Sequence, residues 1–321
     1  MRSHILPTLD GCTLAAIGCV TPELHSLSSD QHLWSHICHS TWPSTTSPRV
    51  RHLILSSFPG GPRSFFSLSF PRSFNFDFPS MTLSPSSFSQ PRELISAVDI
   101  FYRGKCFFSK VQETETVTGW FRCSPFRVDL VGPKKSVPTP VRRRSHDDTC
   151  RDLYTDLELS WIVVDPVNGK AVNVSSLRPV SVERHWLSGE VHVRYAAVVV
   201  GEGDGHVMCS VEVTCVGSGG GLVLHVTEAC LKMEDIDGVH LNGRDSLVIL
   251  YRMLEGKRGN WLKNGRVEEG RKIYFEYLER KRERRERMLR REGRLDNMCI
   301  VIGVLMFIGI LYMLCFSSST R

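Results

Sequence analysis

The chain has 321 residues, 11 cysteines and a formal net charge of +6. The cysteines are odd in number and include no CxxC pair, which argues against both a zinc ribbon and a secreted disulfide framework. The sequence also lacks a Gly-Lys-Ser/Thr phosphate loop, HExxH and GxSxG, so its motifs indicate no catalytic residues, no cofactor and no metal site.

The first 45 residues carry apolar side chains at helical spacing in three short runs. Thr13 to Val20 predicts one helix, which ends before Pro22 because the residue preceding a proline is pushed out of the α region. A second helix is expected to begin at Pro22, and Asp30 is a good N-cap for a third. Helices this short bury little apolar surface, so we expect the segment to need a partner.

Three short motifs occur together in this segment: Leu9-Asp10-Gly11, Leu33-Trp34 and Thr41-Trp42-Pro43. In this combination, residues 1–45 resemble the F-box of plant F-box proteins. That family usually has a longer stretch ahead of the His-Ile-Leu at 4–6, so the first helix is expected to be truncated. The alternative is a helical cap that packs on the chain's own second domain. In F-box proteins the partner is a Skp-type adaptor linked to a cullin, and the resemblance assigns adaptor binding to Leu6, Leu9, Leu14, Leu33 and Trp34.

Residues 46–92 are rich in Ser, Pro and Phe, and they predict a linker. Most of this stretch has neither helical nor strand periodicity, although Val50 to Leu55 fits a short strand or helix. The aromatic content is too high for a plain entropic linker. We expect an irregular segment that its phenylalanines attach to the following domain, with a partner-binding element as the alternative. These residues are Phe65, Phe66, Phe70, Phe74, Phe76 and Phe78.

Residues 93–262 change to short strands bounded by Gly or Pro, which predicts an antiparallel β-sandwich-like domain. The clearest hairpin joins 157–164 to 170–174 through Asn168-Gly169, because Asn-Gly supplies the positive φ values that a tight turn needs. A helix is expected at 244–254, packed on the sandwich. Further strands are expected at 98–104, 105–113, 119–132, 191–195, 209–213 and 222–226.

Two tryptophans give this β domain a resemblance of its own. Ser160-Trp161 before the hairpin and His185-Trp186-Leu187 before the next strand are similar to the β-sandwich of phloem lectins, some of which are fused to F-boxes. The same region resembles the C-terminal domain of the same plant F-box subfamily, though more weakly than residues 1–45 resemble the F-box. We expect Trp161 and Trp186 to be core aromatics, and a sugar-binding role is the alternative.

The C-terminal part combines a basic helix, predicted at 263–297, with an apolar run. Nine basic against four acidic side chains between Glu279 and Arg294 account for nearly all of the net charge, and Glu–Arg pairs at i,i+4 support the helix. Residues 298–316 carry no charge and span roughly 28 Å as a helix, close to the hydrocarbon core of a bilayer. We predict a tail-anchored transmembrane helix, with the basic cluster and everything before it in the cytosol.

Together these segments predict an α+β multi-domain protein with a small helical F-box, an antiparallel β-sandwich-like domain, a basic helix and a single transmembrane helix. We expect the substrate-recognition subunit of a Skp–cullin–F-box ubiquitin ligase, with an unknown protein substrate, on a membrane that we expect to be the endoplasmic reticulum. Contact with membrane lipid is expected at the basic helix, and no nucleic acid is expected because the body is close to neutral. The alternative is a membrane-tethered lectin-like or scaffolding protein whose F-box remnant no longer binds the adaptor.

Overall fold

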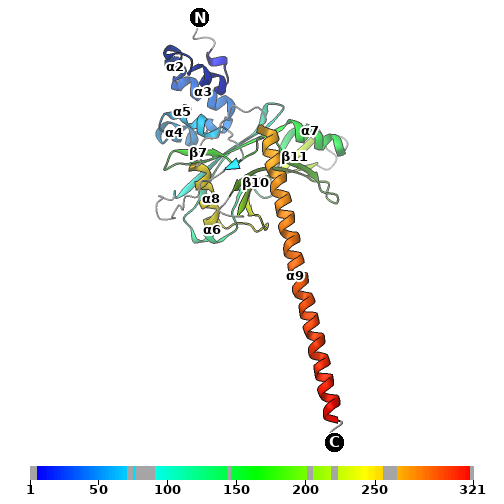
Figure 1. Cartoon of the computed structure of the whole chain (residues 1–321). Coiled ribbons are helices and arrows are strands. Elements are labelled where there is room, and N and C mark those ends of the chain that lie inside the picture. Colours follow the sequence, from blue (N-terminus) through cyan, green and yellow to red (C-terminus); the bar gives the residue numbers. More distant parts are fainter. Residues whose placement is uncertain are drawn as a thin grey trace. The chain divides into compact units, whose positions relative to one another are not determined.

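The described residues form helices and two sheets, which confirms the predicted α+β class (Figure 1). They divide into two compact units, one reaching to Phe275 and the other beginning at Glu276. The computed structural model describes residues 6–70, 75–76, 91–142, 146–200, 205–217, 223–255 and 266–318.

The N-terminal helices form where apolar spacing, Pro22 and the predicted cap at Asp30 place them, and the structure adds caps at Asp10 and Thr21. Asp10 accepts a hydrogen bond from the Thr13 N–H at 2.8 Å, and Asp30 accepts one from the His32 N–H at 2.9 Å. Thr21 caps the second helix in the same way. Each cap satisfies an N–H of the first turn that has no partner within the helix, and the three predicted helices are confirmed. The helical layer consists of η2 (Leu6–Thr8), α1 (Gly11–Ile17), α2 (Pro22–Ser28), α3 (Gln31–Thr41), η3 (Pro43–Thr46), α4 (Pro48–Ser56) and α5 (Gly61–Ser69).

The prediction of an irregular linker over 46–92 is wrong for its first half, which forms α4 and α5. Pro48 and Pro62 lie in the first turn of these helices, where a proline starts a helix instead of breaking it. The buried face of α4 follows the i, i+3, i+4 spacing of an amphipathic helix, with Val50, Leu53 and Ile54. Residues 71–74 and 77–90 of the expected linker lie outside the described residues.

Two sheets share one hydrophobic core, which we call the main core. Their pairings are antiparallel except that of the two-residue β1, which runs parallel to β9. Sheet A has the order β1-β9-β10-β11-β4, with β5 also on β11 and β8 also on β9, and sheet B has the order β3-β2-β6-β7. Sheet A contains β1 (Asn75–Phe76), β4 (Arg127–Asp129), β5 (Val137–Arg142), β8 (Ser181–Arg184), β9 (Val191–Val200), β10 (His206–Gly217) and β11 (Val223–Asp235). Sheet B contains β2 (Glu93–Tyr102), β3 (Lys105–Glu115), β6 (Leu157–Asp165) and β7 (Lys170–Asn173).

The hairpin predicted around Asn168-Gly169 is confirmed. Strands β6 and β7 pair in antiparallel fashion, with Asp165 opposite Lys170. Gly169 has a φ of +58°, and a Cβ atom added there would lie 2.0 Å from the backbone oxygen of Ser57. Glycine is therefore required at this position for two reasons. The backbone is left-handed, and the connection between α4 and α5 approaches too closely to leave room for a side chain.

Other expectations for the β domain meet a mixed outcome. Residues 98–102 lie in β2 and 105–113 in β3, and Arg103 and Gly104 form the turn between these strands. The expected helix is present as α8 (Gly243–Glu255), packed on the main core. The strand expected at 119–132 is wrong in its first part, because Thr118 accepts a hydrogen bond from the Phe121 N–H and caps the short helix α6 (Gly119–Cys123). Helix α7 (His146–Asp156) was not predicted, because it lacks a continuous apolar stripe. Residue 222 lies outside the described residues.

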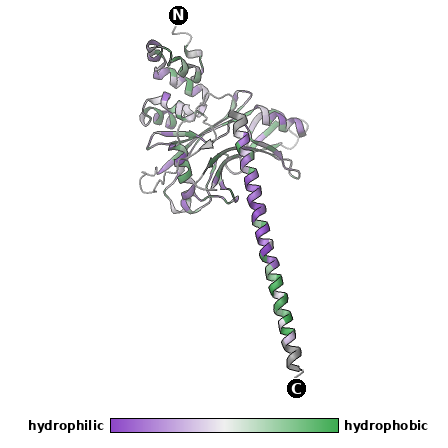
Figure 2. Cartoon of the chain, in the orientation of Figure 1, coloured by the Kyte–Doolittle hydropathy of each residue, from purple (hydrophilic) through white to green (hydrophobic). Residues whose placement is uncertain are grey.

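The second unit is the greater part of one helix, α9 (Arg266–Ser318). Figure 2 shows that this helix is hydrophilic in its first part and hydrophobic farther along. Ion pairs of Arg287 with Glu283 and of Arg290 with Glu286 confirm i,i+4 pairing in the basic stretch. In the described part of the chain, α9 is one helix that is long and apolar enough to cross a membrane, with a mean hydropathy of 2.1 in its most apolar window.

Candidate functional site

The helical layer and sheet B form a second hydrophobic core, which we call the helix–sheet core. Ile95 and Ala97 of β2 face the helices, whereas Leu94 and Val98 of the same strand belong to the main core. Figure 1 shows α4 and α5 beside β7, and α5 packs against that strand. Sheet B is thus covered on both faces, which explains why 157–164 reads as a nearly continuous apolar run. The partner that the short helices need for burial is the chain's own sheet.

The five residues assigned to adaptor binding fall into two groups. Leu14 and Trp34 are 0% and 1% exposed, and the Trp34 Nε1–H donates a hydrogen bond to the Ser28 carbonyl oxygen at 2.6 Å. Both side chains lie in the helix–sheet core, where they expose almost no surface to a partner, and their predicted role in adaptor binding stays a prediction. The other three of the five residues, Leu6, Leu9 and Leu33, are half-buried at the edge of the helix–sheet core and keep accessible surface.

An aromatic cluster holds the helices together. The ring centroids of Trp42 and Phe66 are 5.2 Å apart, and Phe66 lies 5.4 Å from Trp34. A Cβ atom added at Gly11 would lie 2.2 Å from Cζ of Phe66. The glycine of Leu9-Asp10-Gly11 is therefore required by the close approach of α5. Phe65 and Phe66 attach their segment to the rest of the chain, as expected, but from a helix.

A buried carboxylate joins the helical layer to sheet B. Asp99 in β2 is 0% exposed and accepts hydrogen bonds from the Ser44 N–H at 2.8 Å and from the Ser44 hydroxyl at 2.6 Å. Burial raises the pKa of Asp99, and hydrogen bonds from Ser44 and Ser109 act in the opposite direction. Because a buried carboxylate needs donors, this contact specifies where η3 lies on β2. Sequence reasoning missed it, although one Asp inside the apolar run of 94–100 was a usable signal.

A pocket of about 290 Å³ lies where the helical layer meets sheet B. Its volume is just below the range of small-molecule sites, roughly 300–1,000 Å³, and we assign no ligand to it. The carboxylate of Glu158 in its wall is already paired with Arg178 at 2.9 Å. The remaining wall is mostly apolar and includes Trp42, Phe70, Phe101, Leu159 and Leu177.

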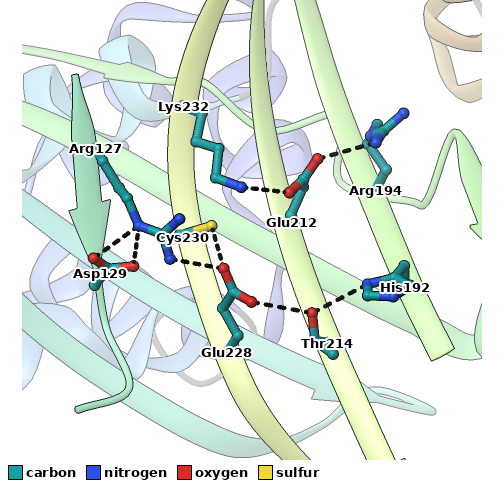
Figure 3. Close-up of polar contacts among 9 residues, drawn as sticks. All are labelled: Arg127, Asp129, His192, Arg194, Glu212, Thr214, Glu228, Cys230 and Lys232. Atoms are coloured by element: carbon teal, nitrogen blue, oxygen red, sulfur yellow. Dashed lines mark hydrogen bonds and ion pairs between the residues drawn. The ribbon is translucent and has the colours of Figure 1, made fainter. Parts of the chain in front are cut away.

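Paired charges cover the face of sheet A that points away from the main core (Figure 3). Lys232 and Arg194 donate hydrogen bonds to Glu212 at 2.7 and 3.0 Å. Partial burial opposes ionisation of Glu212, but these two cations hold its pKa below the ordinary value. Arg127 in turn donates to Glu228 at 2.7 Å. These charges satisfy one another on a partly buried surface, where Arg194 also donates a hydrogen bond to the hydroxyl of the buried Tyr274 at 3.5 Å.

One group on this face has ligand-type atoms close together. Those of Asp129, Glu228 and Cys230 lie within 4.8 Å of one another. Arg127 already pairs with both carboxylates (Figure 3), and burial raises the pKa of the Cys230 thiol to about 12. The thiol is therefore protonated at neutral pH, and a cation would have to displace Arg127. The donors and acceptors of these three side chains are already satisfied by one another and by Arg127.

The two tryptophans singled out from the sequence have opposite surroundings. Trp161 is 0% exposed, and its Nε1–H donates to Ser96 Oγ at 3.1 Å, which confirms its core role. Trp186 is 87% exposed in the turn between β8 and β9, where the His185 ring stacks on it. The expectation of a core role for Trp186 is wrong. Trp186 lies in the turn that links the paired strands β8 and β9, and this turn projects beyond the sheet into solvent.

Comparison with known proteins extends over nearly the whole chain. Probable F-box protein At2g36090 of Arabidopsis thaliana is 46% identical over 309 residues, which are 96% of this chain and 89% of the relative. F-box protein At3g44326 of the same plant is 44% identical over 328 residues, 98% of this chain and 88% of the relative. F-box protein At2g27310, also from Arabidopsis thaliana, is 39% identical over 325 residues, 96% of this chain and 92% of the relative. This chain belongs to the plant F-box proteins.

Membership in the F-box proteins therefore rests on the sheets as well as on the N-terminal helices, since each match covers at least 96% of the chain. No family model and no solved structure matches the chain. F-box proteins in general act with a Skp-type adaptor and a cullin.

Proposed function

We propose that this F-box protein is the substrate receptor of a Skp–cullin–F-box ubiquitin ligase and is not itself an enzyme. The observation that carries the proposal is its identity of 39–46% with three F-box proteins over nearly the whole chain. The N-terminal helices bind the adaptor, the β domain holds a protein substrate, and the ligase partners perform the chemistry. The chain contributes proximity and orientation to ubiquitin transfer.

The packing of the helical layer supports this role. A receptor has to hold its substrate in a defined position relative to the adaptor, because transfer requires the reacting groups to meet. Here the helices and sheet B share the helix–sheet core, and the Ser44–Asp99 hydrogen bonds lie at their junction. An adaptor bound to the helices is then coupled to the β domain through packed side chains.

Leu6, Leu9 and Leu33 are the adaptor contacts that we propose. Each is half-buried and packs at the edge of the helix–sheet core, so each can lose further surface to a partner. Burial of apolar surface contributes roughly 25 cal/mol per Å², so the surface that each half-buried leucine still exposes can add to the binding energy. Truncating them removes this contact and costs the fold less than truncating a fully buried residue does.

Co-purification of the full chain in detergent with a Skp-type adaptor tests the proposal. We expect Leu33→Ala to weaken binding at least tenfold, which corresponds to about 1.4 kcal/mol. Leu68→Ala is the matched control, because Leu68 is half-buried on the same core but lies on α5. Failure of the wild-type chain to bind, or equal binding by the two variants, would refute the proposed contact.

We also propose that α9 anchors the chain in the endoplasmic reticulum membrane, with the body in the cytosol. The apolar residues 298–316 would cross the bilayer, and the basic stretch before them would contact anionic headgroups. Carbonate extraction of membranes checks this arrangement. The full chain should stay in the pellet, and a chain without 298–316 should be released. Release of the full chain by carbonate or high salt alone would contradict the anchor.

The exposed Trp186 favours a second candidate function, carbohydrate binding by a membrane-tethered lectin-like module. An aromatic ring held on an ordered turn offers a flat apolar surface on which a sugar can stack. Ser188 supports this turn through a hydrogen bond from its N–H to His185 Nδ1 at 3.1 Å. A glycan array with the wild-type chain and Trp186→Ala decides the matter. Binding that the variant loses supports this function, and no binding by the wild type rejects it.

A further inference from the structure

Strand β3 is a long edge of sheet B. It has 11 residues and pairs with β2, and within the described ranges no other strand pairs with its outer side. The other edge strands that the structure describes are short, with two residues in β1, three in β4, four in β7 and β8, and six in β5. An edge strand directs a row of backbone N–H and C=O groups outward, and natural proteins usually keep such edges short.

Contacts on both faces of β3 leave its free backbone groups in the plane of the sheet. On one face, Val111 packs against the helix–sheet core and Glu113 pairs with Arg49 at 3.6 Å. On the other face, Phe108 packs against the main core, and Lys110 donates a hydrogen bond to the Leu130 carbonyl oxygen. None of the 11 residues of β3 is buried, whereas seven of the ten residues of β2 are. The difference is that expected between an open edge and a central strand.

The charges of β3 have opposite signs at its two ends. Lys105 begins the strand, and Glu113 and Glu115 lie at its end. Charged side chains on an edge suppress indiscriminate pairing. They also select the polarity of a partner, because oppositely charged residues opposite one another stabilise a strand pair and like charges destabilise it. An antiparallel partner places its first residues opposite Glu113 and Glu115 and its last residues opposite Lys105.

We propose that the outer edge of β3 binds an extended segment of the protein substrate by antiparallel strand addition. The segment carries basic residues near its N-terminal end and an acidic residue near its C-terminal end. Main-chain hydrogen bonds supply affinity in this mode of recognition, and side chains supply specificity. The 11 residues of β3 extend over roughly 36 Å, which accommodates a segment of similar length. This inference rests on the proposed receptor function and names the class of substrate.

The position of β3 suits a receptor. Ser109 in the middle of β3 lies opposite Asp99 of β2, and Asp99 holds Ser44 of the helical layer. Arg49 of α4 also reaches β3 through Glu113. A segment added to β3 would therefore be separated by β3 alone from β2, whose Asp99 makes the contact with Ser44 that joins the sheet to the helices. The adaptor-binding layer and the bound substrate would be coupled through sheet B.

Selection of a phage-displayed library of random twelve-residue peptides on the full chain in detergent tests the proposal. We expect enriched peptides to alternate β-branched or aromatic residues and to carry basic residues in their N-terminal half. A synthetic copy of an enriched peptide should slow backbone hydrogen exchange in β3. Glu113→Lys/Glu115→Lys should weaken that peptide at least tenfold and should enrich peptides of the opposite polarity. Glu183→Lys/Glu190→Lys on the β8–β9 hairpin is the matched control and should enrich the wild-type pattern.

Three outcomes overturn the proposal. The first is that no peptide with strand patterning is enriched. The second is that protection falls on the β8–β9 hairpin and leaves β3 unchanged. The third is that β3 is already protected without peptide and light scattering reports a dimer, because a second copy then occupies the edge.

Adaptor co-purification with the same chains separates this proposal from the receptor function. A Glu113→Lys/Glu115→Lys chain that keeps the adaptor and loses the peptide supports both. A wild-type chain that binds the peptide at β3 and not the adaptor supports strand addition and refutes the receptor function. A wild-type chain that binds the adaptor and enriches no strand-patterned peptide refutes strand addition alone.

Discussion

Asp99 in β2 accepts two hydrogen bonds from Ser44, one from the backbone N–H at 2.8 Å and one from the hydroxyl at 2.6 Å. The two residues are 55 positions apart in the chain, and both are buried. They connect the helices proposed to bind the adaptor to the sheet proposed to hold the substrate. This contact should therefore matter both for stability and for the coupling of the two parts.

Replacing Asp99 by alanine should destabilise the chain. Asp99→Ala leaves the N–H and the hydroxyl of Ser44 buried without an acceptor, and each such group costs about 1–3 kcal/mol. We expect the free energy of unfolding to fall by about 2–4 kcal/mol, measured by denaturant titration with tryptophan fluorescence. Asp129→Ala is the control, because Asp129 is an exposed partner of Arg127 and its loss should cost less than about 1 kcal/mol. Equal losses in the two variants would contradict the role given to Asp99.

The same carboxylate should make stability depend on pH. Burial raises the folded-state pKa of Asp99 above its ordinary value of 3.8, so the folded chain holds this proton more tightly than the unfolded chain does. Its contribution to stability is therefore fully present below the unfolded-state pKa and is lost as pH rises through the folded-state pKa. Asp99→Asn removes the titration. The unfolding free energy of the wild type minus that of the variant should fall as the pH rises above 3.8, and a constant or rising difference would count against this explanation.

Alanine at Gly169 should cost more than alanine at Gly104. Both glycines have positive φ, +58° and +73°, so both substitutions pay the left-handed cost of about 1–2 kcal/mol. Only at Gly169 does the added Cβ meet backbone, 2.0 Å from the Ser57 oxygen, whereas nothing lies within 4 Å at Gly104. Thermal unfolding followed by circular dichroism should show a loss of about 3 kcal/mol or more for Gly169→Ala. Similar losses of stability at both positions would show that the close approach of the Ser57 backbone does not determine the need for glycine at 169.

Trp34 should behave as a core residue. Trp34→Ala removes a fully buried ring, which typically costs about 3–5 kcal/mol. Trp34→Phe keeps an aromatic ring beside Phe66 but leaves the Ser28 carbonyl oxygen without its donor, so we expect a smaller loss of about 1–2 kcal/mol. Denaturant titration of both variants checks the order. An unchanged stability of Trp34→Ala together with a loss of adaptor binding would restore Trp34 to the adaptor surface.

Elements set by neighbours in the chain could be predicted from the sequence. The caps at Asp10, Thr21 and Asp30 act on N–H groups two or three residues away. The Asn168-Gly169 turn and the alternation along β9 to β11 are likewise local, because turn geometry and side-chain direction follow from adjacent residues. Helices α4 and α5 were missed, since Ser, Pro and Phe dominate their composition and their prolines read as breaks.

The family resemblance, the three short N-terminal helices, the Asn-Gly hairpin, the antiparallel strands and the apolar C-terminal helix could all be inferred from the amino-acid sequence. Packing in three dimensions was needed to show that Leu14 and Trp34 are core and Leu33 is half-buried, although all three are apolar residues at helical spacing. Packing was also needed to show that sheet B is covered on both faces, that Asp99 contacts Ser44, and that β3 is an edge strand. Burial and strand pairing depend on residues brought together from distant parts of the chain, and no local pattern records these contacts.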